Sequence, residues 1–211
     1  KLTLENAELA ANSKVAEVLD DREQILYAVF AKSNFYNTVH QTYMELPFGQ
    51  SPMSIMPDAK VGVRFTSYPI GTYALECGSN GDVNTFGRKY RMTADQLVEE
   101  FGYDACPDKV KRAYDEGKGN ANTFIVCWFV LPNKDRNGKL GNKNMPYSSI
   151  YWCEDSNTEE VLRHSGFEEW AIPIARHTTY DLSGYGKGCA WFAQSDAQML
   201  QLLEKDLVTA I

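Results

Sequence analysis

The stretch YALECGSNGDVNTFGRKYRMTADQLVEEFG, residues 73–102, decides the fold. Two runs within it, Tyr73 to Cys77 and Val83 to Arg91, flank the segment Ser79-Asn80-Gly81-Asp82. An Asn-Gly pair supplies the positive φ angles that a tight hairpin turn requires. The two runs are therefore predicted to be paired antiparallel strands.

A helix is predicted directly after this hairpin. Thr93 followed by Gln96 forms a capping box, because each side chain can satisfy the backbone amide of the other residue. Leu97 and Phe101 lie at the spacing of one helical face, and Gly102 can end the helix with a left-handed C-cap. A hairpin followed at once by a helix indicates a mixed α+β chain.

A second hairpin is predicted further along the chain. Thr123 to Leu131 is almost wholly apolar, with β-branched and aromatic residues, which is typical of a buried strand. Tyr147 to Cys153 is the returning strand, and the polar stretch 133–145 is the long loop between them. Val161 to His164 fits helix and strand equally well. Trp170 to His177 is predicted to be a strand, since Pro173 disfavours a helix.

Helices are predicted at both ends of the chain. Asn12 or Ser13 is placed to cap the first, and Ser33 to cap the second. Prolines and a glycine between residues 47 and 57 exclude regular helix, and residues 61–66 alternate as a half-buried strand does. The predicted apolar faces are Val15, Val18, Leu19, Ile25, Leu26, Val29 and Phe30 in the first helix, Phe35, Val39, Tyr43 and Leu46 in the second, and Ala193, Ala197, Leu200, Leu203 and Leu207 in the last.

The composition is that of a globular domain. The chain has 211 residues, of which 44% are apolar and 23% charged, and its net charge is −7. An acidic chain is not expected to be a general nucleic-acid binder, although like charge would let DNA slide past without sticking. No apolar run reaches the ~18 residues of a membrane span. The five cysteines contain no C-x-x-C pair, which favours a reducing compartment.

No residue set predicts catalysis or a bound cofactor. The histidines His40, His164 and His177 have no metal-ligand spacing. Gly184-Tyr185-Gly186-Lys187-Gly188 fails the phosphate-loop pattern, because no Gly-Lys is followed by Ser or Thr. We interpret it as a flexible lead-in to the last helix. The sequence therefore predicts no catalytic, cofactor-binding or metal-binding residue, and a protein that is not an enzyme.

Residues 88–102, RKYRMTADQLVEEFG, resemble the R-x-(F/Y)-x-M-T-A-x-Q-L-V-x-x-F-G stretch of phage head-to-tail connecting proteins, the portal proteins of short-tailed phages. The resemblance extends over roughly residues 15–205. The chain departs from the family pattern at His177, where Trp is usual, at Cys189, where Pro is usual, and at residues 49–52. Further pieces that match in the same order are Ser33-Asn34-Phe35-Tyr36, Tyr68-Pro69-Ile70-Gly71-Thr72-Tyr73, Ser165-Gly166-Phe167, Pro173-Ile174-Ala175-Arg176 and Tyr185-Gly186-Lys187-Gly188.

The resemblance implies a structural virion protein without catalytic residues or cofactors. Such a protein forms a ring, dodecameric in this family, at one capsid vertex, where a terminase pumps double-stranded DNA through it and the tail docks. It implies contacts with capsid, terminase and tail proteins but no membrane, and a location in the virion and, during assembly, in the host cytoplasm.

The expected fold is α+β: N-terminal helices, a largely antiparallel strand meander with an inserted helix, and a C-terminal helix. Residues 1–50 would be the helical part of the portal wing, residues 51–188 its α+β domain and residues 189–211 the start of the stem helix, so that the chain is expected to be a fragment. Two alternatives remain open: a non-portal phage structural adaptor, and a small hydrolase that uses a cysteine or carboxylates.

Overall fold

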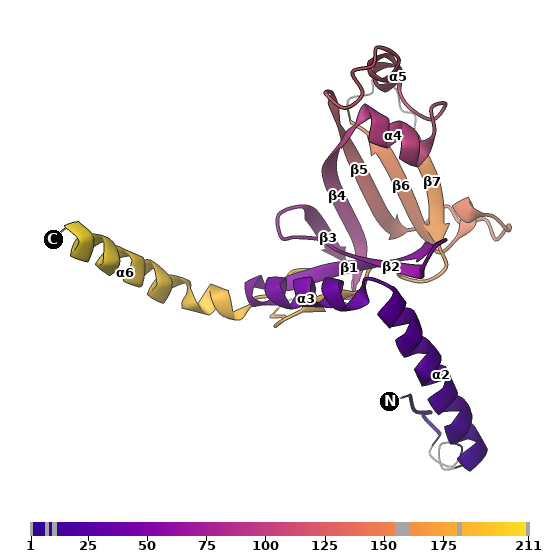
Figure 1. Ribbon diagram of the computed structural model, residues 1–211. Helices are drawn as coiled ribbons and strands as arrows, with labels where there is room; N and C mark the ends of the chain where they lie inside the picture. The colour runs from indigo at the N-terminus through magenta and orange to yellow at the C-terminus, as the bar shows by residue number, and fades with distance from the viewer. Residues whose placement is uncertain (1, 7–8, 10–11, 155–160, 181–182, 210–211) are drawn as a thin grey trace.

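The computed structural model describes residues 2–6, 9, 12–154, 161–180 and 183–209 (Figure 1). Within them the mixed α+β prediction is confirmed. The helical elements are α2 (Ser13–Lys32), α3 (Phe35–Glu45), the 3-10 turn η1 (Leu46–Phe48), α4 (Ala94–Phe101), α5 (Asp108–Asp115), the 3-10 turn η2 (Asn142–Asn144) and α6 (Cys189–Thr209). The strands are β1 (Gln50–Asp58), β2 (Gly62–Ser67), β3 (Tyr73–Cys77), β4 (Val83–Thr93), β5 (Thr123–Pro132), β6 (Tyr147–Cys153), β7 (Val161–Phe167) and β8 (Ile174–Arg176).

The strands form two antiparallel sheets. The larger has the order β3-β4-β5-β6-β7, so strands that are consecutive in the chain pair with one another, as the predicted meander requires. The smaller has the order β2-β1-β8. Helices α4 and α5 lie at one end of the larger sheet and the smaller sheet at the other (Figure 1). We call the two sheets with α3, α4 and α5 the body. Helices α2 and α6 project away from it in different directions (Figure 1).

Both hairpins stand where the sequence places them. Gly81 has a φ of 80° in the turn between β3 and β4. Strands β5 and β6 pair from Val126 with Cys153 to Pro132 with Tyr147, and the loop of residues 133–146 joins them. The capping box at Thr93 is present with both of its hydrogen bonds. Gly102 has a positive φ of 87°, but its ψ of 148° is extended and not left-handed helical.

The core occupies one face of the larger sheet in two clusters. Leu97 of α4 and Val110 of α5 pack on Val126, and all three side chains are fully buried. At the other end of the sheet, Phe86 and Trp128 are packed with other buried residues. Burial alternates along β5 and β6: 3% of Trp128 is exposed but 36% of Phe129, and Trp152 of β6 is 38% exposed.

Two predictions for the helices need correction. The apolar stripe of α2 is largely exposed, Ile25 by 65%, and none of the residues described in this helix is buried. In α3 the expected face is wrong, because Tyr43 is 65% exposed and the buried residues are Thr38 and Thr42. Each threonine hydroxyl bonds a carbonyl one turn earlier in its own helix, so this polar face can lie directly on the small sheet.

Strand β1 was missed because its prolines argue against a central strand. Pro52 lies one residue beyond the last pair with β2, Met53 with Ser67, and its carbonyl oxygen still accepts a hydrogen bond of 3.1 Å from the Tyr68 N–H, so only a donor is missing there. The predicted strand at residues 170–177 is shorter, Ile174–Arg176. The ambiguous segment at Val161 is strand β7.

Candidate functional site

The histidines do not gather into a reactive centre. His40 is exposed on α3, His164 lies 2.9 Å from the Ser148 hydroxyl, and His177 lies 2.9 Å from the Thr178 hydroxyl. In the part of the chain that the structure describes, no three His, Cys, Asp or Glu residues are grouped so that they could hold a metal ion. That the chain carries no catalytic or metal-binding residue stays a prediction.

The buried thiols are poor candidates for a nucleophile. Cys106, Cys127 and Cys153 are buried in the body. Burial raises the pKa of the Cys106 and Cys127 thiols, since an apolar environment disfavours the thiolate. A nucleophilic cysteine requires the opposite shift, which a neighbouring cation or helix N-terminus produces. The geometry therefore favours structural roles for these residues.

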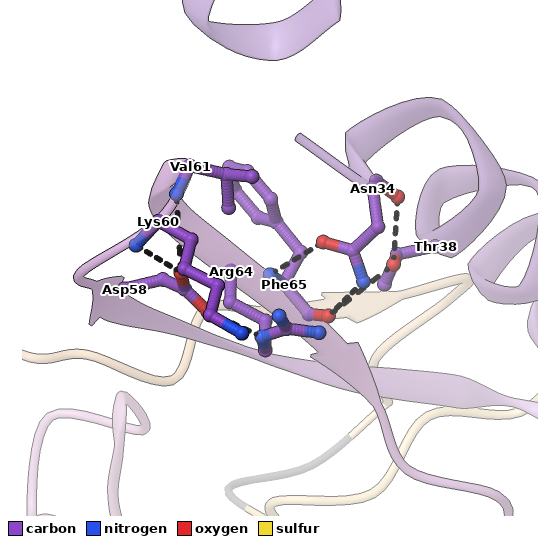
Figure 2. A network of polar contacts seen from close by, with 7 residues as sticks. All are labelled: Asn34, Thr38, Asp58, Lys60, Val61, Arg64 and Phe65. Atoms are coloured by element: carbon purple, nitrogen blue, oxygen red, sulfur yellow. Dashed lines mark hydrogen bonds and ion pairs between the residues drawn. The ribbon is translucent and has the colours of Figure 1, made fainter. Parts of the chain in front are cut away.

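The most specific polar arrangement joins the two N-terminal helices to the edge of the small sheet (Figure 2). Asn34, between α2 and α3, accepts a hydrogen bond of 2.9 Å from the Phe65 backbone N–H and donates one of 2.6 Å to the Phe65 carbonyl oxygen. The Thr38 hydroxyl lies 3.0 Å from the Asn34 carbonyl oxygen and 3.4 Å from that of Phe65. The Asn34 carboxamide thus pairs with β2 as a neighbouring strand would.

This pairing blocks an open strand edge. Strand β2 is the outer strand of its sheet, so the N–H and C=O of Phe65 point away from β1 and need another partner. The rings of Phe30 and Phe35 stack 4.1 Å apart, and Phe65 lies edge-on to them at 6.0 and 5.0 Å. The end of α2 is therefore held by a directional hydrogen-bond pair and by aromatic packing.

Asp58 shapes the turn between β1 and β2. Its carboxylate accepts hydrogen bonds from the Arg64 side chain at 2.7 Å and from the backbone N–H groups of Lys60 and Val61 at 2.8 and 3.1 Å (Figure 2). These hydrogen bonds lower the pKa of Asp58 to about 2, and the bond from Arg64 contributes most. The turn positions β2, and hence Phe65, for the contact with Asn34.

The start of α6 is anchored by glycines. A Cβ on Gly186 would overlap the Gly49 carbonyl, and one on Gly188 would overlap the Pro47 carbonyl and lie 2.7 Å from the Gly49 nitrogen. The Gly49 carbonyl accepts a hydrogen bond of 2.8 Å from the His177 N–H, and the Gly186 N–H donates one of 3.0 Å to the Gln50 side chain. The interpretation as a flexible lead-in is wrong, because these glycines permit two backbones to pack in direct contact.

Beyond this anchor α6 is uncovered. Every described residue from Trp191 to Thr209 is exposed, with Leu203 at 60% and Leu207 at 65%. The apolar face predicted for the last helix is therefore present in α6 and uncovered. Ile211 lies outside the described residues. No helix in the described part of the chain is both long and apolar enough to span a bilayer.

Comparison with known proteins identifies the family. The model of the family "Bacteriophage head to tail connecting protein" matches residues 1–211. The chain belongs to this family. It is 34% identical to the portal protein of Salmonella phage epsilon15 over 181 residues, 84% of this chain and 32% of that protein. It is 30% identical to the probable portal protein of Bordetella phage BPP-1 over 203 residues, 95% of this chain and 36% of that protein. The chain spans about a third of the length of these curated relatives.

Two contacts anchor the projecting helices: the pair of Asn34 with Phe65 at the end of α2, and the glycine contacts at the start of α6. Both lie in segments that carry the resemblance to the family. Asn34 belongs to Ser33-Asn34-Phe35-Tyr36, and Gly186 and Gly188 belong to Tyr185-Gly186-Lys187-Gly188. The sequence analysis identified these two segments, but it did not predict which part of the chain each of them contacts. The partners, Phe65 and the segment at Gly49, are distant in the chain, and no local pattern points to them.

Proposed function

We propose that this chain is part of a portal protein, a structural ring at one capsid vertex through which double-stranded DNA is packaged and ejected and to which the tail attaches. The observation that carries the proposal is the family match over residues 1–211 together with the portal names of both relatives. The ring is formed by copies of the chain, twelve in number, and meets capsid, terminase and tail proteins. It resides in the virion and, during assembly, in the host cytoplasm.

The two projecting helices support an assembling role. In α2 (Ser13–Lys32) and α6 (Cys189–Thr209), no described residue is buried, although both carry apolar side chains. Most of the stability of a helix comes from packing of its apolar face, so such helices need a covering partner. Contacts between different faces of successive copies close into a ring when the rotation allows it.

The parts of the chain have separate roles in this proposal. Residues 1–50 are the helical part of the wing, residues 51–188 are its α+β domain, and residues 189–211 begin the stem helix. The role is structural and not catalytic. The raised pKa values of the buried thiols Cys106 and Cys127 support this assignment over that of a cysteine hydrolase.

Electron microscopy of the full-length protein tests the proposal. We expect closed rings with twelvefold symmetry, and a protein that stays monomeric or forms open assemblies would overturn the portal assignment. The variant Leu203→Asp with Leu207→Asp should lose ring formation, because it places charges on the uncovered stripe of α6. The matched control is Ser195→Asp with Gln198→Asp, which adds the same charge at exposed polar positions of the same helix and should form rings.

A further inference from the structure

The loop between β5 and β6 has a charge opposite to that of the rest of the chain. Residues 133–146 contain four cationic side chains and a single carboxylate, a net charge of +3. Since the whole chain carries −7, the remaining residues carry −10. We call residues 133–146 the basic loop; its cations are Lys134, Arg136, Lys139 and Lys143, and its carboxylate is Asp135. It projects from the larger sheet at the end opposite to α4 and α5, coloured salmon in Figure 1.

The cations of the basic loop are available to a partner. All four side chains are exposed, and none has an ion-pair partner among the residues with described positions. Some cations elsewhere in the body already have a partner, since Arg64 pairs with Asp58 and Arg163 with Glu100. A group of like charges without partners repels itself, and a bound polyanion relieves that repulsion.

The base of the basic loop has a fixed shape. Asn133 donates from its side-chain amide to the carbonyl oxygens of Lys143 at 2.9 Å and Met145 at 3.0 Å. Its backbone N–H donates to the Pro146 carbonyl at 2.8 Å. Gly166 of β7 lets the returning arm lie close, since a Cβ there would meet the Asn142 carbonyl at 2.7 Å. Asn133 therefore ties the two arms together and sets the spacing of the lysines beside it.

A cleft of about 440 Å³ opens at this base. Its lining includes the cations Lys134 and Lys143, the polar side chains of Asn144, Ser148 and His164, and the carboxylate of Asp135. The two ammonium groups and the Asn144 amide are donors of the kind that bind phosphate oxygens in protein–DNA contacts, whereas the buried Ser148 hydroxyl is already hydrogen-bonded to His164. Asp135 opposes an anion there, and the two lysines of the cleft outweigh it in charge.

We propose that the basic loop is the segment of this chain that contacts the phosphates of duplex DNA, without reading its sequence. The inference rests on the proposed portal function, which brings DNA past the protein. Taken together, the residues outside the loop carry a net charge of −10 and on balance repel phosphate, so we place the main contact at the loop. The composition favours DNA over a protein partner, because the cores of protein interfaces are depleted in lysine and need contiguous apolar area. Of the large apolar side chains in the loop, Leu140 is exposed and Met145 is not.

The expected strength follows from the number of phosphates. The affinity for DNA falls as the salt concentration rises, and each phosphate that a cation neutralises steepens the slope of log affinity against log salt by about 0.9. One loop, with few such contacts, therefore binds weakly and in a salt-dependent way. Several loops of one ring that contact the same duplex would add their effects through high effective concentration. A single copy is therefore expected to hold DNA poorly even though the ring holds it measurably.

The test compares two variants of the full-length protein in binding to a duplex of arbitrary sequence. The loop variant changes Lys134, Arg136, Lys139 and Lys143 to Gln. The matched control changes Lys60, Arg91, Lys109 and Arg112 to Gln, which are exposed and lie outside both the loop and the projecting helices, so both variants have the same net charge. We expect the loop variant to lose about tenfold or more in affinity at about 50 mM salt and to show a smaller salt slope, and the control to bind as the unchanged protein does.

A third variant keeps the charge: Lys134→Arg, Lys139→Arg and Lys143→Arg should bind DNA as tightly as the unchanged protein. The proposal is overturned if the loop variant binds normally, or if the control loses as much affinity. It is also overturned if the loop variant loses ring assembly while its remaining rings bind DNA normally, since the loop would then be a contact between copies. If the unchanged protein forms no rings but the loop variant still loses DNA binding, the portal function fails and the loop inference stands.

Discussion

Replacing Asn34 with Ala should destabilise the protein by about 2 kcal/mol. The substitution removes two hydrogen bonds to the backbone of Phe65, whose side chain is only 4% exposed. A polar group left unpaired in such a place costs about 1–3 kcal/mol. The Phe65 carbonyl keeps the 3.4 Å contact with the Thr38 hydroxyl, so its loss is partly offset. In a chain of this size about 2 kcal/mol lowers the Tm by about 4–8 °C.

Thermal unfolding and hydrogen exchange measure the effect. The matched control is Asn37→Ala, the same substitution at an exposed position in the first turn of α3, which should change stability by less than about 0.5 kcal/mol. In the Asn34 variant the amide proton of Phe65 should exchange much faster, since no strand covers that edge of β2. Equal Tm values for the two variants, or an unchanged exchange rate at Phe65, would refute the strand-like role of Asn34.

Three further predictions concern the body and the second anchor. Thr93→Ala should lower the free energy of unfolding in urea by about 1 kcal/mol through loss of the cap, and Gly102→Val by a similar or larger amount because its φ is 87°; two unchanged urea midpoints would contradict the capped helix. Gly188→Ala should cost about 1–3 kcal/mol in thermal unfolding, against almost nothing for the exposed neighbour Cys189→Ala. Asp58 has a pKa lowered from 3.8 to about 2, so its ionised form stabilises the fold above about pH 4 and this contribution disappears as the pH falls to about 2. The Tm difference between the protein and Asp58→Asn should shrink over that range, and a difference independent of pH would contradict it.

The sheet meander was predictable because its signals are local. The Asn80-Gly81 turn, the capping box at Thr93 and the apolar run at residues 123–131 each specify an element within a few residues. Hairpins join neighbours in the chain, so once the strands are known their order follows. This is why strands β3 to β6 agree with the expectation, whereas β7 lies in a segment that fits helix and strand equally well.

The smaller sheet and the anchors could not be predicted in the same way. Strand β1 contains Pro52 and Pro57 and pairs with β8, more than a hundred residues later, so neither its composition nor its neighbours reveal it. In α3 the sequence pattern favoured an apolar face, but the contact with the sheet is made by Thr38 and Thr42. Helical periodicity reports which residues are apolar, and here hydrogen bonding to a strand edge decides which face is covered.

The two projecting helices are attached to the body in the same physical way. Apolar burial is non-directional, whereas the Asn34 pair with Phe65 and the backbone contacts of Gly49, Gly186 and Gly188 fix orientation as well as position. Each helix can therefore leave the body at a set angle while its apolar stripe stays uncovered. A stripe that is already oriented loses less conformational freedom when a partner covers it, which lowers the entropic cost of association. Anchors made of polar and backbone contacts thus suit a chain whose apolar helices are kept for contacts in the proposed ring.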